Sequence, residues 1–303
     1  MASNSYGMFK RNGVPIAIGD DYSSGKVLWA SSDGLAGNSG KDPEHPISTI
    51  DGAINKFETA DANSGCRIFV MEGHAETLSA ATSLVPDVAG LQIIGLGHGA
   101  DAPDLTFSAT TSTITVGAAN VRLKNLNFIA GVSAVSVGVT CHDYTIIEDC
   151  RFDFSTTAYD FVRMIDIDAH DYAQILNNRF IAENATAGSN EAIRLDDCHH
   201  VVIDGNYISG DFARAAIIGE GGLGKSLKIT NNYIFNDDTG AASNGIDLNV
   251  AFTGIIDGNY IFSLYATACA AVIDPGSCGM GVNYISNKVD QYAISTAVGA
   301  AST

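Results

Sequence analysis

The chain has 303 residues, 46% hydrophobic and 17% charged, with 32 glycines and a formal net charge of −18. This composition is typical of a compact, turn-rich soluble protein. The negative charge argues against nucleic acids and anionic membranes as partners, because phosphate binding needs clustered Lys and Arg, and no apolar run is long enough to span a bilayer.

The N-terminal part predicts an arm followed by a cap. Residues 1–33 lie outside any repeat and lack the apolar core of a secretory signal, so we expect them to form an N-terminal arm. The stretch 45–60 places four apolar side chains on one helical face, with Ser48 as the expected N-cap. A helix there would cover the open end of a solenoid. Ile68 and Ile93 then mark the first coils.

A repeat occupies the rest of the chain. The hexapeptide IDGNYI occurs at 203–208 and again at 256–261, with imperfect copies around it. The first apolar residue of each copy defines a set of equivalent positions, at intervals of 24 to 28 residues: Leu123, Ile147, Ile175, Ile203, Ile229, Ile256 and Tyr284. A period of this length indicates one small structural unit stacked many times.

Each repeat holds two short apolar runs. The earlier runs are VRMIDID (162–168), EAIRLDD (191–197), AAIIGE (215–220), NGIDLNV (244–250) and AVIDP (271–275). They alternate apolar and polar residues and are too short for helices, which predicts strands. Repeated short strands without helices predict an all-β fold, a single-stranded parallel β-helix. This solenoid would span 34–292, including the capping helix, and be followed by a tail at 293–303.

One asparagine recurs in the turn of each repeat. Stacked side-chain amides can satisfy one another and the turn backbone, since each amide has donors and an acceptor. We therefore predict a structural ladder at one corner of the solenoid, formed by Asn178, Asn206, Asn232, Asn259 and Asn287.

With this repeat, the chain resembles the pectate-lyase-like superfamily of right-handed parallel β-helices over roughly residues 40–290. The resemblance implies right-handed coils. It is a strong signal for the fold and a weak one for activity, because one fold supports many functions. The lyases of this superfamily have sequence motifs that are not recognisable here. Within the superfamily, the chain is similar to β-helix proteins of bacteriophage particles, such as capsid decoration proteins and tailspikes.

Two further patterns concern ligands. The turns CHDYTII, AHDYAQI and CHHVVI align one above another, so a divalent metal, if one binds, would use His142, Asp143, His170, Asp171 and His199. A solvated turn ladder is the favoured interpretation, and no cofactor is predicted. Tyr144 and Tyr172 of the same turns are candidates for glycan binding. The six cysteines lack metal-site spacing and are expected to be reduced.

A polar column is predicted on the outer face of the earlier strand. It contains Asp166, Arg194, Glu220 and Asp247, followed by Asp274, with Asp168, Asp196 and Asn249 two residues further along. Adjacent coils would place such carboxylates about 4.8 Å apart, and alternate coils about twice that, near the separations of glycosidase pairs. The column is therefore the catalytic candidate if the chain is an enzyme. An arginine between carboxylates also resembles superfamily lyases, in which Arg can abstract a proton beside a calcium site.

Three functions follow from these patterns. The favoured one is a non-enzymatic structural protein of a bacteriophage particle, a capsid decoration or spike-like subunit assembled in the host cytoplasm. It would be a homotrimer that contacts the capsid or other virion proteins through residues 1–33. The alternatives are a polysaccharide lyase or glycoside hydrolase using the acidic column, and a non-catalytic module that binds a surface glycan.

The surroundings of the carboxyl groups decide whether the column can cleave a glycan. A glycan-cleaving site needs one carboxyl group that holds its proton and another that is ionised, so their surroundings must differ. The small variation in repeat length leaves no long loop to wall in the column. We therefore expect its carboxylates to be uniformly hydrated, to titrate near ordinary values, and to cleave no polysaccharide.

Overall fold

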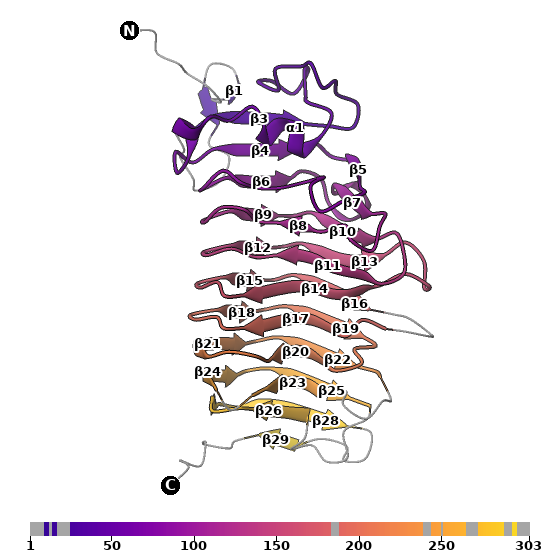
Figure 1. Ribbon diagram of the computed structural model, residues 1–303, viewed down its shortest axis with the longest axis vertical. Coiled ribbons are helices and arrows are strands. Elements are labelled where there is room, and N and C mark those ends of the chain that lie inside the picture. The colour runs from indigo at the N-terminus through magenta and orange to yellow at the C-terminus, as the bar shows by residue number, and fades with distance from the viewer. Residues whose placement is uncertain are drawn as a thin grey trace.

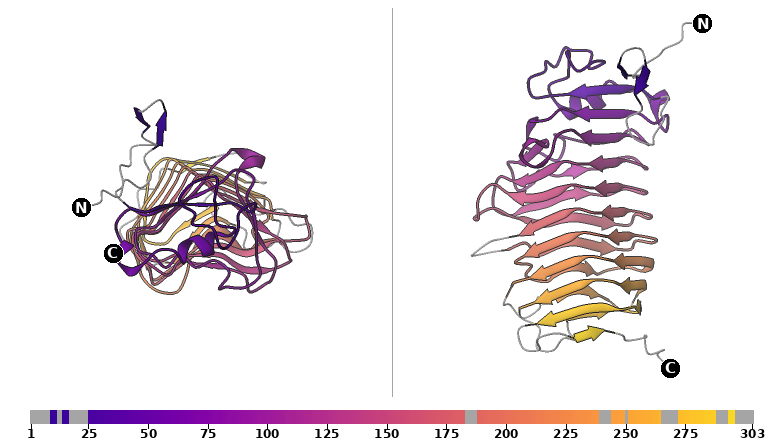
Figure 2. Two further views of the ribbon diagram at one scale, coloured as in Figure 1. Left: turned by 90° about the horizontal axis from the view of Figure 1, so that it is seen from above. Right: turned by 180° about the vertical axis from the view of Figure 1, so that it is seen from behind.

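A computed structural model describes residues 25–182, 188–238, 244–249, 251–264 and 272–286 in full. For Asn287 and three strands it describes the backbone: β1 (Phe9–Arg11), β2 (Val14–Ile16) and β29 (Ala293–Ser295). The chain winds into an elongated stack of coils (Figure 1). Seen along the long axis, successive coils superpose (Figure 2). The predicted all-β parallel solenoid is confirmed.

Three sheets run along the stack, and their neighbouring strands are parallel except for the antiparallel pair β28–β29. Sheet I contains β3 (Val27–Ala30), β4 (Arg67–Val70), β6 (Gln92–Gly95), β9 (Arg122–Lys124), β12 (Ile146–Glu148), β15 (Gln174–Leu176), β18 (Val202–Asp204), β21 (Gly224–Thr230), β24 (Phe252–Asp257) and β27 (Gly279–Met280). Sheet II contains β5 (Ala75–Leu78), β7 (Asp104–Phe107), β10 (Asn127–Ala130), β13 (Arg151–Phe154), β16 (Arg179–Ala182), β19 (Tyr207–Gly210), β22 (Tyr233–Asn236), β25 (Tyr260–Ser263), β28 (Asn283–Asn287) and β29. Sheet III contains β8 (Ile114–Thr115), β11 (Val135–Thr140), β14 (Phe161–Asp168), β17 (Glu191–Asp196), β20 (Ala215–Gly219), β23 (Asn244–Leu248) and β26 (Ile273–Pro275).

The repeat positions form one inward column in sheet I. The column begins at Leu28, and its members pair in register: Leu28, Ile68, Ile93, Leu123, Ile147, Ile175, Ile203, Ile229, Ile256 and Met280. All except Met280 are buried, and Met280 packs against the same core. Burial of this continuous apolar column stabilises the stack through the hydrophobic effect.

The prediction of the last repeat position, Tyr284, was wrong. Tyr284 pairs with Tyr260 in sheet II and is exposed, whereas Met280 continues the column of sheet I. The final coil is therefore shorter than the predicted 28 residues. The tripeptide Asn-Tyr-Ile recurs at 206, 232, 259 and 283, and would have identified the correct alignment.

The N-terminal elements differ from their predicted bounds. β3 already belongs to sheet I, so the solenoid begins inside the segment 1–33 that was expected to be an arm. The helix α1 is short (Ile50–Ile54), and its N-cap is Thr49 rather than Ser48, because the Thr49 side chain accepts from the amide of Gly52. α1 buries Ile50, Ala53 and Ile54 against β3 and β4 (Figure 1).

The chain leaves the helical conformation soon after α1. Two short 3₁₀ turns, η1 (Thr59–Asp61) and η2 (Gly99–Asp101), are the other helical elements in the described part of the chain. No helix of that part is long and apolar enough to cross a bilayer.

The asparagine ladder lies at the corner between sheets I and II. Its members are Asn178, Asn206, Asn232, Asn259 and Asn283, all buried. Oδ1 of each member after Asn178 accepts from the backbone amide of the asparagine one coil earlier, as from Asn206 to Asn232 at 3.0 Å, and Oδ1 of Asn178 accepts from the amide of Cys150. Each Nδ2 donates to a main-chain carbonyl of the preceding coil, as from Asn206 to Ile175 at 2.8 Å. The predicted Asn287 was wrong, because it pairs with Ser263 within the strands.

We expect Asn206→Ala to lower the free energy of unfolding by about 1–3 kcal/mol, because buried donors and an acceptor lose their partners. The affected groups are the amides of Asn178 and the carbonyl of Ile175, at 2.8–3.1 Å from the Asn206 amide. Urea denaturation measures the effect, with Asn127→Ala, at a partly exposed position of sheet II, as the control. An unchanged denaturation midpoint in Asn206→Ala would show that the ladder contributes nothing to stability.

The described cysteines lie inside the coils. Five are buried free thiols: Cys66, Cys141, Cys150, Cys198 and Cys278. Burial raises the pKa of the Cys150 and Cys198 thiols to about 12 and that of Cys278 to about 11. They act as small apolar side chains rather than as nucleophiles. Cys269 lies outside the described residues.

Candidate functional site

Two outward rows of side chains, polar except at Ile218, follow the outer face of sheet III. The first row is Asp166, Arg194, Ile218, Asp247 and Asp274. The second row, two residues further along the strands, is Asp168, Asp196, Glu220 and Asn249.

Glu220 therefore lies in the second row, not in the first as predicted. The interval from the first row to the inward column of sheet I is nine residues from Asp166 to Ile175, but eleven from Ile218 to Ile229. A register irregularity between Gly224 and Leu227 in β21 lies in this longer connection. Counting back nine residues from Ile229 selected Glu220 instead of Ile218.

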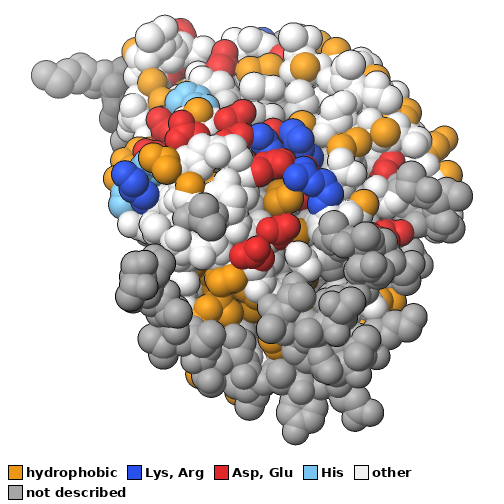
Figure 3. Space-filling view, turned by 60° about the horizontal axis from the view of Figure 1, so that its bottom comes forward, with side chains coloured by type: hydrophobic (Ala, Val, Ile, Leu, Met, Phe, Trp, Pro, Cys, Tyr) orange, Lys and Arg blue, Asp and Glu red, His pale blue; other side chains and the backbone are white. Residues whose placement is uncertain are grey.

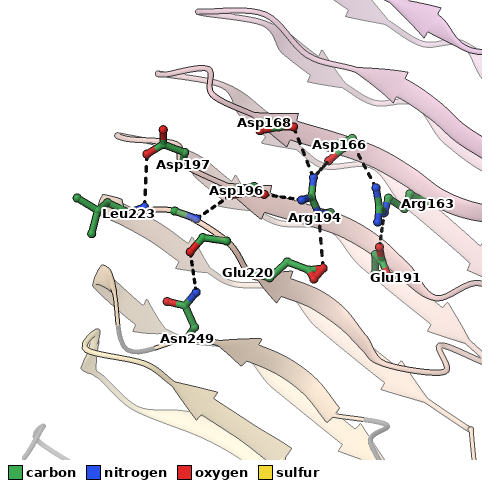
Figure 4. Close-up of polar contacts among 12 residues, drawn as sticks. Arg163, Asp166, Asp168, Glu191, Arg194, Asp196, Asp197, Glu220, Leu223 and Asn249 are labelled. Carbon is green, nitrogen blue, oxygen red and sulfur yellow. Dashed lines mark hydrogen bonds and ion pairs between the residues drawn. The ribbon is translucent and has the colours of Figure 1, made fainter.

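Arg194 is the centre of the polar cluster (Figure 4). Its guanidinium donates to Asp166 at 2.9 Å and to Asp196 at 2.5 Å, and its Nε lies 3.6 Å from Glu220. Only 13% of its side chain is exposed. Burial alone would lower the pKa of Arg194, but the hydrogen bond and charge of Asp166 outweigh it and raise the pKa. Arg194 thus joins carboxylates from three consecutive coils.

Arg214, which precedes β20, holds Glu220 with two parallel hydrogen bonds. The distances from its two terminal nitrogens to the two carboxylate oxygens are 2.7 and 2.8 Å. The hydrogen bond from Arg214 outweighs the effect of burial and lowers the pKa of Glu220, with help from the charge of Arg194. Glu220 is therefore ionised at neutral pH.

Glu191 is buried beneath Arg163 and Arg214. Its side chain is 0% exposed, and Oε1 accepts from Nε of Arg163 at 2.6 Å. Oε2 lies 3.8 Å from Arg214. Burial is the main cause of the raised pKa of Glu191, and both arginines oppose it.

The pKa of Asp247 is shifted in the opposite direction to that of Glu220. Burial raises its pKa, and the charge of Asp274 on the next coil raises it further, although Arg214 opposes the change. Glu220 adds a smaller repulsion. Two carboxyl groups in neighbouring coils thus have pKa values shifted in opposite directions.

The expectation of a uniformly hydrated column was therefore wrong. Within the predicted column, side-chain exposure of the carboxylates ranges from 11% at Asp166 to 55% at Asp168. The long arginine side chains cover neighbouring carboxylates, so burial arises without long loops. In the space-filling view, acidic and basic side chains gather in one region (Figure 3).

Sequence reasoning missed Arg163, Glu191 and Arg214. Arg163 and Glu191 are paired in register, one coil of 28 residues apart, so opposite charges at this spacing were a usable signal. Arg214 lies in a connection before β20, and its contact with Glu220 depends on the reach of its side chain. No pattern in the sequence indicated it.

The histidine turns connect the strands of sheet III to those of sheet I, directly after the second polar row. Among the described residues, His142, Asp143 and His170 form one group with ligand atoms within 4.8 Å of one another. Nδ1 of His142 accepts from the amide of Asp143 at 2.7 Å, which leaves the proton on Nε2. The two imidazoles stack at 4.3 Å with 27° between their planes, so their in-plane lone pairs do not converge. This arrangement fits a turn ladder better than a metal site.

The other two predicted metal ligands belong to the same ladder. Oδ1 of Asp171 accepts from the amide of His199 at 2.7 Å, as Oδ1 of Asp143 does from the amide of Asp171 at 2.9 Å. Burial alone would raise the pKa of Asp143, but the hydrogen bonds from Asp171 and His170 lower it. These carboxylates cap backbone amides of the next coil.

The tyrosines of these turns also stack. The rings of Tyr144 and Tyr172 are parallel at 4.6 Å, and Tyr172 stacks on His200 at 4.6 Å. Both faces of Tyr172 are covered by neighbouring rings. A sugar at this ladder would therefore meet the edge of Tyr172 and not its face.

No known protein family and no curated protein matches the chain. Similar solved structures include a rhamnogalacturonan lyase, with 12% identity and a TM-score of 0.49, covering 86% of this chain and 87% of that chain. Another is the GH136 lacto-N-biosidase from Eubacterium ramulus, with 9% identity and a TM-score of 0.45, covering 85% of this chain and 67% of that chain.

Proposed function

We propose that this chain is a glycoside hydrolase acting on an uncharged glycan at the outer face of sheet III. Asp247 is the proton donor, and Glu220 is the ionised carboxylate. One observation carries the proposal: neighbouring coils hold these groups with pKa values shifted in opposite directions. Surroundings that favour the protonated form of one carboxyl group and the ionised form of the other assign the acid and the base in glycan-cleaving sites.

The strand register supplies the spacing. Asp247 pairs with Ile218, and Glu220 follows Ile218 by two residues on the same outer face. With neighbouring strands about 4.8 Å apart and a rise of about 3.3 Å per residue, the two Cα atoms are about 8 Å apart. Side chains on two such Cα atoms can hold their carboxyl groups about 6.5–9.5 Å apart, the separation that leaves room for a water molecule in inverting hydrolases.

The proposed reaction uses both groups at once. Asp247 gives its proton to the glycosidic oxygen, so that the leaving sugar departs as an alcohol. Glu220 takes a proton from a water molecule that attacks the opposite face of the sugar. Arg214 keeps Glu220 ionised and oriented, while each carboxylate oxygen retains a second lone pair for the water.

Charge favours an uncharged substrate. The cluster contains three arginines, Arg163, Arg194 and Arg214, which are paired with Asp166, Asp196, Glu191 and Glu220. Asp168, Asp247 and Asp274 add further negative charge when ionised, so an anionic glycan would be repelled.

The virion role, the homotrimer and the capsid contact of residues 1–33 stay predictions, since no described residue tests them.

The proposal predicts release of reducing ends from a neutral glycan, with inversion at the anomeric carbon. The test is a panel of neutral polysaccharides and oligosaccharides, followed by a reducing-end assay and by NMR of the first product anomer. No release from any neutral glycan would contradict the proposal. Cleavage restricted to anionic glycans, or a product of retained configuration, would contradict the assigned substrate charge or mechanism.

The rate should depend on pH as a bell with an acidic optimum. Activity rises as Glu220 ionises, and its pKa lies below the ordinary 4.5. Activity falls as Asp247 loses its proton, and its pKa lies above the ordinary 3.8. A profile of kcat/KM against pH reports these two groups in the free enzyme. An optimum at alkaline pH would assign the chemistry to other groups.

A further inference from the structure

A second aromatic surface lies on the outer face of sheet II in the C-terminal half. Four tyrosines pair in register along it: Tyr207, Tyr233, Tyr260 and Tyr284. All four are exposed, by 38% to 54%. Phe235 and Phe262 form a parallel row two residues further along the strands, with rings stacked at 5.3 Å.

The tyrosine row is interrupted. Tyr207 stacks on Tyr233 at 5.1 Å, and Tyr260 stacks on Tyr284 at 4.8 Å. Among the described rings, no stacking contact joins Tyr233 to Tyr260, although their backbones are paired. Each of these two rings thus has one face that no neighbouring tyrosine covers.

A groove of about 270 Å³ lies at this interruption. Its lining includes Tyr233, Tyr260, Tyr284 and Phe262, and contains no Asp, Glu, Lys or Arg. It crosses three consecutive coils, β22, β25 and β28, so it runs along the solenoid axis. An elongated, uncharged ligand fits this lining, because a charged one would be desolvated without a partner.

We infer that this groove binds an uncharged glycan chain, with a sugar ring on the open face of Tyr233 or Tyr260. The π face of a tyrosine is electron-rich and attracts the slightly positive C–H groups on the face of a pyranose. The phenol hydroxyls beside it can exchange hydrogen bonds with sugar hydroxyls. This groove is formed by strands of sheet II. It differs from the Tyr144–Tyr172 ladder in the turns, where both faces of Tyr172 are covered.

The groove is placed to hold a distant part of the proposed substrate, and in this respect the inference rests on the proposed function. From β7 to β25, each strand of sheet II is followed by a strand of sheet III: β22 precedes β23, which carries Asp247, and β25 precedes β26, which carries Asp274. β23 also contacts both β22 and β25. A glycan bound in the groove would lie partly on the coil that carries the proposed proton donor Asp247, one coil beyond Glu220.

The test is calorimetric titration of the full chain carrying Asp247→Asn, which blocks turnover, with cellohexaose, mannohexaose and xylohexaose. We expect at least one probe to bind, and Tyr260→Ala to raise its dissociation constant about tenfold or more. Tyr260→Phe should retain most of the affinity, because the ring face remains. Tyr144→Ala, on the other tyrosine ladder, should bind as the parent does.

Three outcomes would overturn the inference. The first is no binding by any of the three probes. The second is equal loss in Tyr260→Ala and Tyr144→Ala. The third is a fall in assembly mass of Tyr260→Ala by light scattering, which would make a second copy of the chain the occupant. Binding is read in a chain without turnover, so its failure and the failure of hydrolysis are distinguishable.

Discussion

Asp247→Asn should reduce kcat/KM on a neutral glycan by about 10²–10⁴-fold, because the general acid is lost. KM should change little, since the lost interaction belongs to the transition state. The fold should survive the change. The folded state raises the pKa of Asp247, so ionisation of this carboxyl group destabilises the fold as the pH rises. Because Asn cannot ionise, the variant should be at least as stable as the parent at neutral pH.

The matched control is Asp168→Asn on the same face. More than half of the Asp168 side chain is exposed, and the carboxylate lies 3.9 Å from Arg194, so its removal should leave the rate within a few-fold of the parent. Equal loss in both variants would mean that the whole acidic face acts only as a charged surface. Full activity in Asp247→Asn would exclude Asp247 as the proton donor.

Arg194→Met should lower the free energy of unfolding by about 3–5 kcal/mol, because removing one partner leaves buried carboxylates without compensation. The affected groups are Asp166 and Asp196, whose side chains are 11% and 17% exposed. Met retains much of the apolar stem, so the loss reports the charge and hydrogen bonds. Urea denaturation at neutral pH measures it.

Arg151→Met provides the comparison for that variant. Arg151 lies on the outer face of sheet II, about half exposed, and pairs only with Asp153 among the described ion pairs. An exposed pair contributes about 0–1 kcal/mol. A similar small loss in Arg194→Met would show that the cluster on sheet III is hydrated and does not join the coils.

The solenoid was predictable because its repeat carries the same information many times. The inward column from Leu123 to Ile256 and the ladder from Asn178 to Asn259 both occupy the predicted positions. The errors came where the repeat is irregular. The last coil is short, which displaced Tyr284 and Asn287, and the connection after Ile218 is long, which displaced Glu220.

The electrostatics of the site were harder to predict than its residues. Asp166, Arg194 and Asp247 were placed in one column correctly. Their surroundings depend on Arg163, Glu191 and Arg214, whose side chains cross between coils and cover the carboxylates. A period in the sequence gives the height of a residue in the stack, but not the conformation of a long side chain. That is why the expected uniform hydration was wrong.

The most direct test of the account is the ionisation of Glu220 and Asp247 in the intact chain. Carbon-13 NMR of the carboxyl groups, assigned through Glu220→Gln and Asp247→Asn, follows each group as the pH is varied. We predict that Glu220 titrates below 4.5 and Asp247 above 3.8. The proposed roles also require Asp247 to retain its proton to higher pH than Glu220. Ordinary pKa values for both groups, or Glu220 titrating above Asp247, would contradict the assignment of acid and base.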